Sequence, residues 1–212
     1  MISELCKIRN LNKNVLYRRP THIRWDNSCP IGIGGVDLSG KAYRYNLPRR
    51  LQGRVFNNAL EFLASMVGRW IDILDGSITP QIYMLALTDK SSACGWLHKS
   101  KFISADHSFH ATIAKNLATL FISSDSSIYS QHFFGKLNVT FDSLSRDHRI
   151  NDAKLTFLLQ RSFPQQAPQN FKICPLPPTI TSWVNSLLLE MPEKAPEHQA
   201  QMTSSNRRGY AG

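Results

Sequence analysis

The stretch HIRWDNSCPIGIGGVDLSGKAYRYNL, residues 22–47, decides the fold. Residues 22–26 alternate between apolar and polar side chains, as a half-buried strand does. Residues 31–38 are expected to form a second strand, which carries three glycines. After the tight turn Ser39-Gly40, residues 41–47 alternate again. Because short turns join these three strands, the stretch predicts an antiparallel meander.

The period of the apolar residues changes after this meander. From about residue 54 to residue 74 they recur at three- and four-residue steps, which predicts a long amphipathic helix. The unbroken apolar run 82–87 is typical of a strand that is covered on both faces. Further elements are expected along the rest of the chain: helices over 91–97, 110–121, 141–159 and 181–189, and a strand over 128–134.

This order of elements, β-β-β-α-β-α-(α)-β-α, predicts an α/β fold with helices packed on a mixed sheet. Residues 1–20 are expected to be a basic leader or the remnant of an upstream segment. Residues 21–160 are expected to form the folded domain. Seven of the eleven prolines follow Arg161, so residues 161–212 are expected to hold a proline-rich linker, one short helix and a disordered tail.

The composition excludes several classes of protein. The chain has 212 residues, and no apolar stretch approaches the roughly 18–20 residues of a membrane-spanning helix. Its first residues have no apolar core of a secretory signal. The four cysteines are far apart and form no C-x-x-C pair, which indicates reduced thiols and a cytoplasmic or nuclear location.

Positive charge is concentrated in the first quarter of the chain. The net charge is +10, from 25 Lys and Arg against 15 Asp and Glu. Up to Arg54, eleven basic residues face only three acids. This imbalance favours a polyanionic partner, most simply a nucleic acid, although a solvated surface would give the same count.

Four acids lie where the expected strands and helices meet. Asp26 is in the first strand, Glu61 is in the long helix, Asp89 ends the buried strand, and Asp142 is near a later helix start. Gathered at one edge of the sheet, their carboxylates would repel each other. Mg²⁺ removes that repulsion and prefers oxygen ligands. For any one acid alone, a role as a turn residue, a helix cap or a solvated residue is favoured, and only the four together favour a functional site.

Four sequence segments in this order resemble the ribonuclease H domain of retroelement polyproteins. They are WDNSCPIGIGG (25–35), NNALEFLA (57–64), LALTDKSSACGWL (85–97) and SQHFFGKLNVTFDSLSR (130–146). The resemblance spans about residues 21–189 and is strongest in the last segment. The segment PLPPTITSWVNSLL (175–188) is similar to the one that comes after this domain in retroelements that encode a tyrosine recombinase.

The resemblance implies a ribonuclease H-like fold with a mixed five-stranded sheet, in which three antiparallel strands precede parallel ones and helices cover both faces. It implies that Asp26, Glu61, Asp89 and Asp142 are catalytic and bind two Mg²⁺ ions, with Mn²⁺ as the alternative. The substrate would be the RNA strand of an RNA–DNA hybrid, and reverse transcriptase and recombinase modules of the same element would be partners. The expected substrate-binding residues are Ser28, Lys90, Ser91 and His148.

Two other functions stay open at this point. Phe141 stands directly before the last acid, where the family usually has alanine, and no polymerase motif precedes the domain. Both features favour a catalytically inactive nucleic-acid-binding or scaffold module. A transposase or integrase core is disfavoured, because those proteins usually place their glutamate last and here Glu61 is second.

Overall fold

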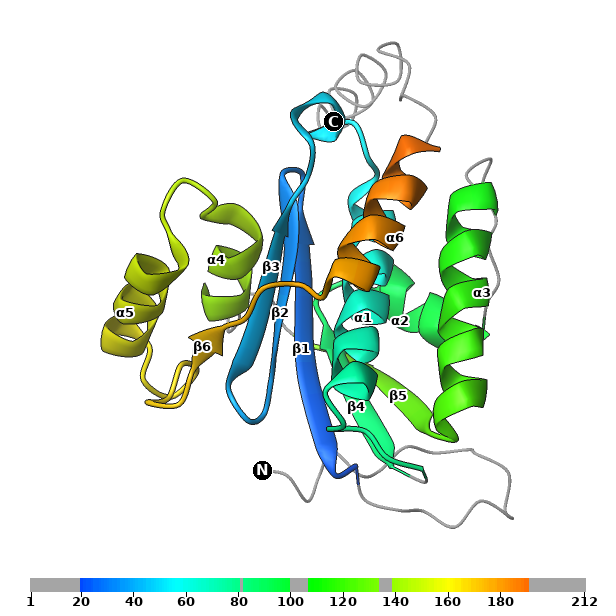
Figure 1. Ribbon diagram of the computed structural model, residues 1–212, viewed down its shortest axis with the longest axis horizontal. Helices are drawn as coiled ribbons and strands as arrows, with labels where there is room; N and C mark the ends of the chain where they lie inside the picture. Colours follow the sequence, from blue (N-terminus) through cyan, green and yellow to red (C-terminus); the bar gives the residue numbers. More distant parts are fainter. Residues whose placement is uncertain (1–19, 81, 100–106, 134–138, 191–212) are drawn as a thin grey trace, which may run out of the picture.

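We describe residues 20–80, 82–99, 107–133 and 139–190 in a computed structural model of the chain. Six strands form one sheet in the order β5-β4-β1-β2-β3-β6 (Figure 1). The expected leader up to residue 19 and the expected tail from residue 191 lie outside the described residues. The strands are β1 (His22–Cys29), β2 (Gly32–Asp37), β3 (Lys41–Asn46), β4 (Tyr83–Thr88), β5 (Ser127–His132) and β6 (Lys172–Ile173).

The meander forms as its turns predict. β1 pairs antiparallel with β2, and β2 pairs antiparallel with β3. The apolar strand β4 lies between β1 and β5 and runs parallel to both, so it is buried on its two edges. The carboxyl ends of β1 and β4 therefore lie side by side, with Trp25 of β1 opposite Leu87 of β4.

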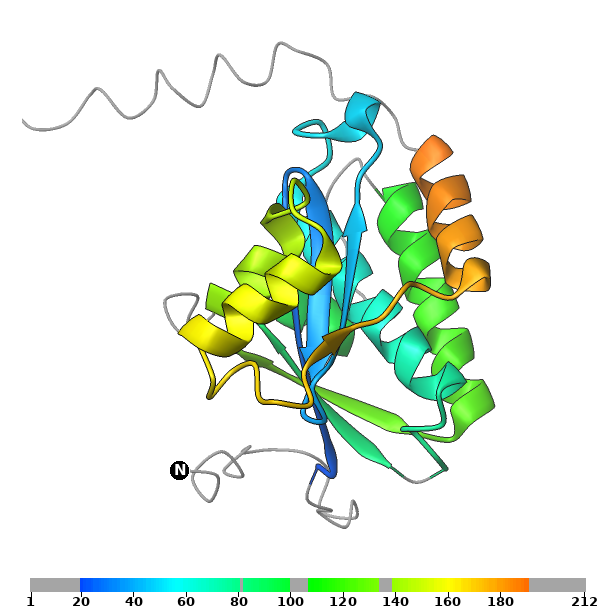
Figure 2. The ribbon, with the colours of Figure 1, turned by 60° about the vertical axis from the view of Figure 1, so that its left-hand side comes forward.

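Helices cover both faces of this sheet (Figures 1 and 2). α4 and α5, drawn in yellow-green and yellow, lie on one face, and α1, α3 and α6 lie on the other. The expected α/β class, a mixed sheet with helices on both faces, is therefore confirmed, with six strands among the described residues where five were expected. The helices are α1 (Asn57–Leu74), α2 (Ser91–Lys99), α3 (His107–Ser124), α4 (Val139–Arg146), α5 (Asp152–Ser162) and α6 (Pro178–Leu189), with a 3₁₀ turn η1 (Arg49–Leu51).

Two elements differ from the expectation. The single helix expected over 141–159 is two helices, because Asn151 starts a new one: its side chain accepts a hydrogen bond from the backbone N–H of Lys154, as a cap does. The sixth strand, β6, lies within the proline-rich segment. The backbone N–H groups of Lys172 and Cys174 donate to carbonyls beside and within β3, so this part of the segment belongs to the sheet.

α1 is the central helix of the larger core. The sequence pattern predicts one apolar stripe on it, whereas the structure buries residues all round the helix, including Glu61, Ser65 and Asp72. The reason is that α3 and α6 cover the faces of α1 that the sheet does not. α6 packs through buried Ile180 and Val184, and Trp183 meets Trp70 edge-on at 5.8 Å between ring centroids.

Among the described residues, no helix has the length and apolar character needed to cross a membrane.

Candidate active site

A row of polar side chains runs along β1 where this strand faces α1. Alternate residues of a strand share one face. On β1 the face toward α1 is polar, and α1 places polar residues opposite it. We call this row the β1–α1 seam. Its members are His22, Arg24, Asp26 and Ser28 on β1 and Glu61 and Asp72 on α1.

Glu61 lies at the end of the seam nearest the carboxyl ends of β1 and β4. Its Oε1 accepts hydrogen bonds from the backbone N–H of Ser28 at 2.7 Å and from the Ser28 hydroxyl at 3.0 Å. Its Oε2 accepts from the hydroxyl of Thr88 at 3.1 Å. Burial, joined by the charge of Asp89, raises the pKa of Glu61 to about 8. The side chain is therefore fixed in place by neutral donors, and no basic side chain pairs with it among the described residues.

Asp89 follows β4 directly and lies close enough to Glu61 to raise its pKa. Its side chain is 19% exposed, and its Oδ2 is 3.6 Å from the ammonium of Lys90. Its Oδ1 is buried and has no hydrogen-bond partner among the described residues. Ser91 is exposed at the first position of α2. A carboxylate oxygen buried beside a second carboxylate, with nothing donating to it, is where a cation would be stabilised.

Asp26 lies one step inward from Ser28 on the same face of β1 and is fully buried. Its Oδ1 accepts from Arg24 at 3.1 Å and from the hydroxyl of Tyr43 at 3.4 Å, and its Oδ2 has no partner in the described part of the chain. Burial raises its pKa to about 7, against the opposing effect of Arg24. Gly68 of α1 allows this packing, because a Cβ there would lie 2.5 Å from Asp26 Oδ1.

Asp142 reaches the site from the opposite face of β1. It lies in the first turn of α4, and its Oδ1 accepts from the amide of Asn27 at 3.4 Å. The Nε of Arg146, one turn later, lies 2.6 Å from each of its carboxylate oxygens. Phe141 stacks on Trp25 with 5.5 Å between ring centroids, so this larger ring is buried against β1 and helps to position α4.

His148 lies beyond α4, in the connection to α5. Its Nε2 is 3.0 Å from the carbonyl oxygen of Ser145. A Cβ at Gly32 would lie 2.2 Å from that nitrogen, so the glycine lets the imidazole pack against β2. Burial and the charge of Arg44 lower the pKa of His148, which keeps the ring neutral near pH 7.

The structure thus brings three of the expected site residues into one group: Ser28, Glu61 and Asp89, joined through Thr88. Asp26 adjoins this group on the same strand face, but its contacts are with Arg24 and Tyr43. Asp142 lies on the α4 side of β1, where Asn27 contacts it, and Arg146 lies close enough to Asp89 to interact with its charge. The potential ligand atoms are all oxygens, which is the ligand chemistry of Mg²⁺ and Mn²⁺. In the described part of the chain, however, no three of the four acids bring ligand atoms within 4.8 Å of one another.

Several polar residues at the site were not singled out from the sequence. Thr88 orients Glu61, Asn27 contacts Asp142, and Arg24 neutralises acids from within the core. The alternation in HIRWDNS was the available signal: residues 22, 24, 26 and 28 are all polar, which is unusual for a strand face that a helix covers. Arg24 was counted with the surface charge, although only 1% of its surface is exposed.

Comparisons with known proteins give distant structural matches alone. No protein-family model matches the chain, and no curated protein matches it in sequence. Among solved structures, ribonuclease H1 of Halobacterium salinarum aligns at 14% identity with a TM-score of 0.47, covering 59% of this chain and 95% of that one. LC11 ribonuclease H1 in complex with an RNA/DNA hybrid aligns at 12% identity and a TM-score of 0.48, covering 60% and 95%. The N-terminal ribonuclease H domain of a Mycobacterium tuberculosis protein aligns at 14% and 0.45, covering 59% and 91%.

Proposed function

We propose that this chain is a metal-dependent endoribonuclease that cleaves the RNA strand of RNA–DNA hybrids. One observation carries the proposal: Glu61 is held between Ser28 and Thr88 at the carboxyl ends of two parallel strands, beside an Asp89 oxygen that has no partner among the described residues. The carboxyl ends of parallel strands are where open α/β sheets bind their ligands.

In this proposal, Glu61 and Asp89 hold divalent ions together with Asp26 and Asp142. Two Mg²⁺ ions, or Mn²⁺ in their place, would supply an activated water and stabilise the leaving oxygen. Ser28 and Thr88 bind the two oxygens of the Glu61 carboxylate and prevent its rotation. Lys90, 36% exposed beside Asp89, is placed to contact a substrate phosphate. Ser91 and His148 are proposed to border the same substrate.

Exposed basic residues at the same end of the molecule support a polyanionic substrate. Arg49 and Arg50 are exposed on η1, which follows β3. Hydrogen bonds from Leu47 to Ile31 and from Gly53 to Pro30 fasten this turn to the β1–β2 connection. The two arginines therefore lie at the same end of the strands as Glu61, the carboxyl end of β1. A hybrid held there would be recognised by its backbone shape and its 2′-hydroxyl groups.

We also propose the biological setting that the sequence resemblance implies. The domain would belong to a retroelement polyprotein with a tyrosine recombinase, and it would work in the cytoplasm or nucleus beside reverse transcriptase and recombinase modules.

Substitution of Asp89 tests the proposed activity. Asp89→Asn keeps the size of the side chain but removes the charge beside Glu61, so we expect Mg²⁺-dependent cleavage of a labelled hybrid to fall by at least about 100-fold. Hybrid binding, measured in EDTA, should stay within about twofold. The matched control is Asp125→Asn, because Asp125 is exposed and its positive φ of 45° is one that asparagine tolerates. Equal cleavage by wild type and Asp89→Asn would contradict the proposal.

A second function is favoured by the basic partners of two acids. Arg146 contacts both oxygens of Asp142, and Arg24 contacts Asp26, so two of the four acids already have a cation. A module that binds nucleic acid without cutting it would show salt-sensitive hybrid binding and no cleavage in Mg²⁺ or Mn²⁺. Measurable turnover that Asp89→Asn abolishes would exclude this function.

A further inference from the structure

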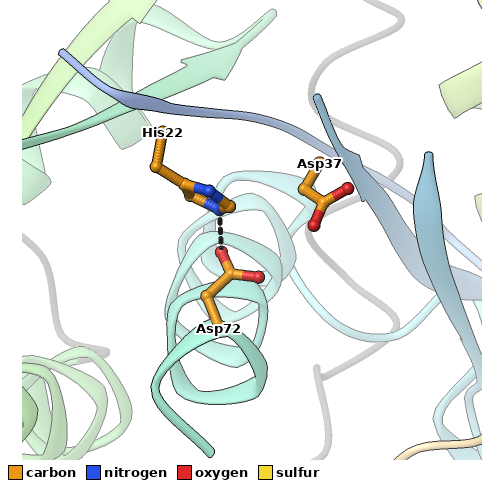
Figure 3. Close-up of side chains that lie close together, drawn as sticks. All are labelled: His22, Asp37 and Asp72. Carbon is orange, nitrogen blue, oxygen red and sulfur yellow. Dashed lines mark hydrogen bonds and ion pairs between the residues drawn. The ribbon is translucent and has the colours of Figure 1, made fainter. Parts of the chain in front are cut away.

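A second group of metal-ligand side chains lies at the other end of the β1–α1 seam. His22 is the first residue of β1, Asp37 is the last residue of β2, and Asp72 is in the last turns of α1. Figure 3 shows the three side chains converging from these elements. Each offers one ligand atom, and these atoms lie within 4.8 Å of one another. Asp37 and Asp72 are buried, and the His22 side chain is 12% exposed at the rim.

The buried cations of this region are unevenly shared among its carboxylates. Arg24 donates to Asp72 Oδ1 at 2.6 Å and to Asp26 Oδ1 at 3.1 Å. Arg69 is also buried and interacts with the charge of Asp72, but it bonds to Met84 and Ser126. Lys41 is 38% exposed and is bound to Asp75 at 2.8 Å.

Asp37 is the carboxylate to which Arg24 does not bond. Its Oδ1 accepts from the Ser39 hydroxyl at 2.7 Å and from the backbone N–H of Lys41 at 2.9 Å. Its Oδ2 is buried and has no hydrogen-bond partner among the described residues, while the residue as a whole is 3% exposed. An unpartnered buried carboxylate oxygen carries a large desolvation cost, which a bound cation removes. This unpartnered oxygen is a second, independent observation that points to a bound cation.

We propose that His22, Asp37 and Asp72 bind one divalent transition-metal ion, with Zn²⁺ as the best match. One imidazole nitrogen and two carboxylates form a mixed ligand set that suits Zn²⁺, whereas Mg²⁺ prefers oxygen ligands and several waters. His22 Nε2 lies 2.9 Å from Asp72 Oδ2. Two tetrahedral ligands with bonds of about 2.0–2.1 Å are roughly 3.3 Å apart, so these two atoms would need to separate by only about 0.4 Å to bind one ion.

The proposed ion would connect the beginning of β1, the end of β2 and the end of α1. It would replace the contact between His22 and Asp72 and bring Asp37 into the same shell. Because Asp37 and Asp72 are far apart in the chain and His22 is in a third element, the ion would stabilise the folded chain over the unfolded one. The site is distinct from the Glu61 group at the opposite end of the seam, and it does not depend on the proposed nuclease activity.

The test is metal binding by the full chain after treatment with EDTA. We expect a stoichiometric amount of Zn²⁺ to raise Tm, and calorimetry to give one tight site. Mg²⁺ at the same concentration should not change Tm. Co²⁺ in place of Zn²⁺ should give a visible absorption band that reports nitrogen and oxygen ligation, a readout that needs no enzymatic activity. Absence of a Zn²⁺-dependent shift in Tm would overturn the proposal.

Asp37→Asn separates this site from other places where Zn²⁺ could bind. Asparagine can still accept from Ser39 and Lys41 while it removes the partnerless charge, so the metal-free variant should have a Tm at least equal to that of the wild type. Its Zn²⁺ affinity should fall at least tenfold. The control Asp89→Asn should keep the Zn²⁺ response. Loss of that response in Asp89→Asn, or its retention in Asp37→Asn, would place the ion elsewhere and overturn the proposal.

Discussion

Buried carboxylates have different kinds of hydrogen-bond partner at the two ends of the β1–α1 seam. At the amino end of β1, Arg24 neutralises Asp72 and Asp26 directly. At the carboxyl end, Glu61 receives only neutral donors, from Ser28 and Thr88. A carboxylate oxygen that bonds to a buried cation contributes to the fold, whereas an oxygen with only neutral donors, or with no partner, is available to an ion from outside. This difference explains why one strand can serve both stability and the proposed chemistry.

The ligand chemistry of the two ends differs as well. The carboxyl end offers oxygens alone, and the amino end adds the imidazole of His22. If both ends bind ions, they should prefer different ones, since hard Mg²⁺ takes oxygen ligands and Zn²⁺ accepts nitrogen. Variants and solution conditions that act on only one end test this contrast.

The largest effect should come from Arg24. Arg24→Met leaves Asp26 and Asp72 buried without their cation, so we expect the free energy of unfolding to fall by about 3–5 kcal/mol. Ser28→Ala, at the other end, removes one neutral donor from Glu61 and should cost about 1 kcal/mol. Urea unfolding in EDTA measures both. Equal losses would show that the two ends are not held by different kinds of interaction.

The control for Arg24 is Lys41→Met. It breaks the ion pair with Asp75, in which the two side chains are 38% and 27% exposed. Exposed pairs contribute little, so the loss should stay below about 1 kcal/mol.

The next effect is a dependence of stability on pH in the absence of divalent ions. The pKa of Glu61 is raised to about 8 in the folded chain from an ordinary value of 4.5. Between these values the folded chain binds more protons than the unfolded one, so stability falls as pH rises. The slope should be about 1 kcal/mol per pH unit from about pH 6 to about pH 8. Glu61→Gln should reduce it to the part that Asp26 contributes, because the pKa of Asp26 is raised to about 7, and saturating Mg²⁺ should reduce it as well.

Asp152→Asn provides the matched control for this pH experiment, because Asp152 is 53% exposed and paired with Arg44. It should leave the slope unchanged. A slope that persists in Glu61→Gln and disappears in Asp152→Asn would assign the titration to the surface and not to the seam.

The smallest effect concerns the binding of a hybrid. Arg49→Gln combined with Arg50→Gln removes two exposed charges at the carboxyl end, so affinity should fall by about tenfold and the salt slope should decrease by about 2. Lys41→Gln combined with Lys172→Gln removes the same charge from the amino end, where these residues are register partners in β3 and β6. This second pair should have little effect. Filter binding at several salt concentrations distinguishes the two ends.

The sequence predicts the fold well where local pattern and burial agree. The turns after residues 29 and 38 determine the meander, and the unbroken apolar run at 82–87 gives a strand that is flanked on both edges. The break between α4 and α5 was missed, although Asn151 is a typical capping residue. β6 could not be predicted, because its two residues follow no alternation and pair through distant carbonyls at Gly40 and Ala42.

The site is less predictable than the fold, because charge partners come from distant elements. The sequence identifies Glu61 and Asp89 as candidate acids, and the structure shows how Ser28 and Thr88 hold the first of them. The alternation of polar residues on β1 does not identify Asp72, which is 48 residues away, as the partner of Arg24. Basic residues are usually exposed, so a buried arginine is recognised only after the strand and helix are placed.

The seam also fixes how far α1 can slide along β1. An apolar interface would tolerate a shift of one helical turn, about 5.4 Å, because any apolar side chain can replace another. Here such a shift would separate His22 and Arg24 from Asp72 and, at the same time, Ser28 from Glu61. Two groups of polar contacts at opposite ends of one strand thus specify a single alignment, and the position of Glu61 between Ser28 and Thr88 follows from it.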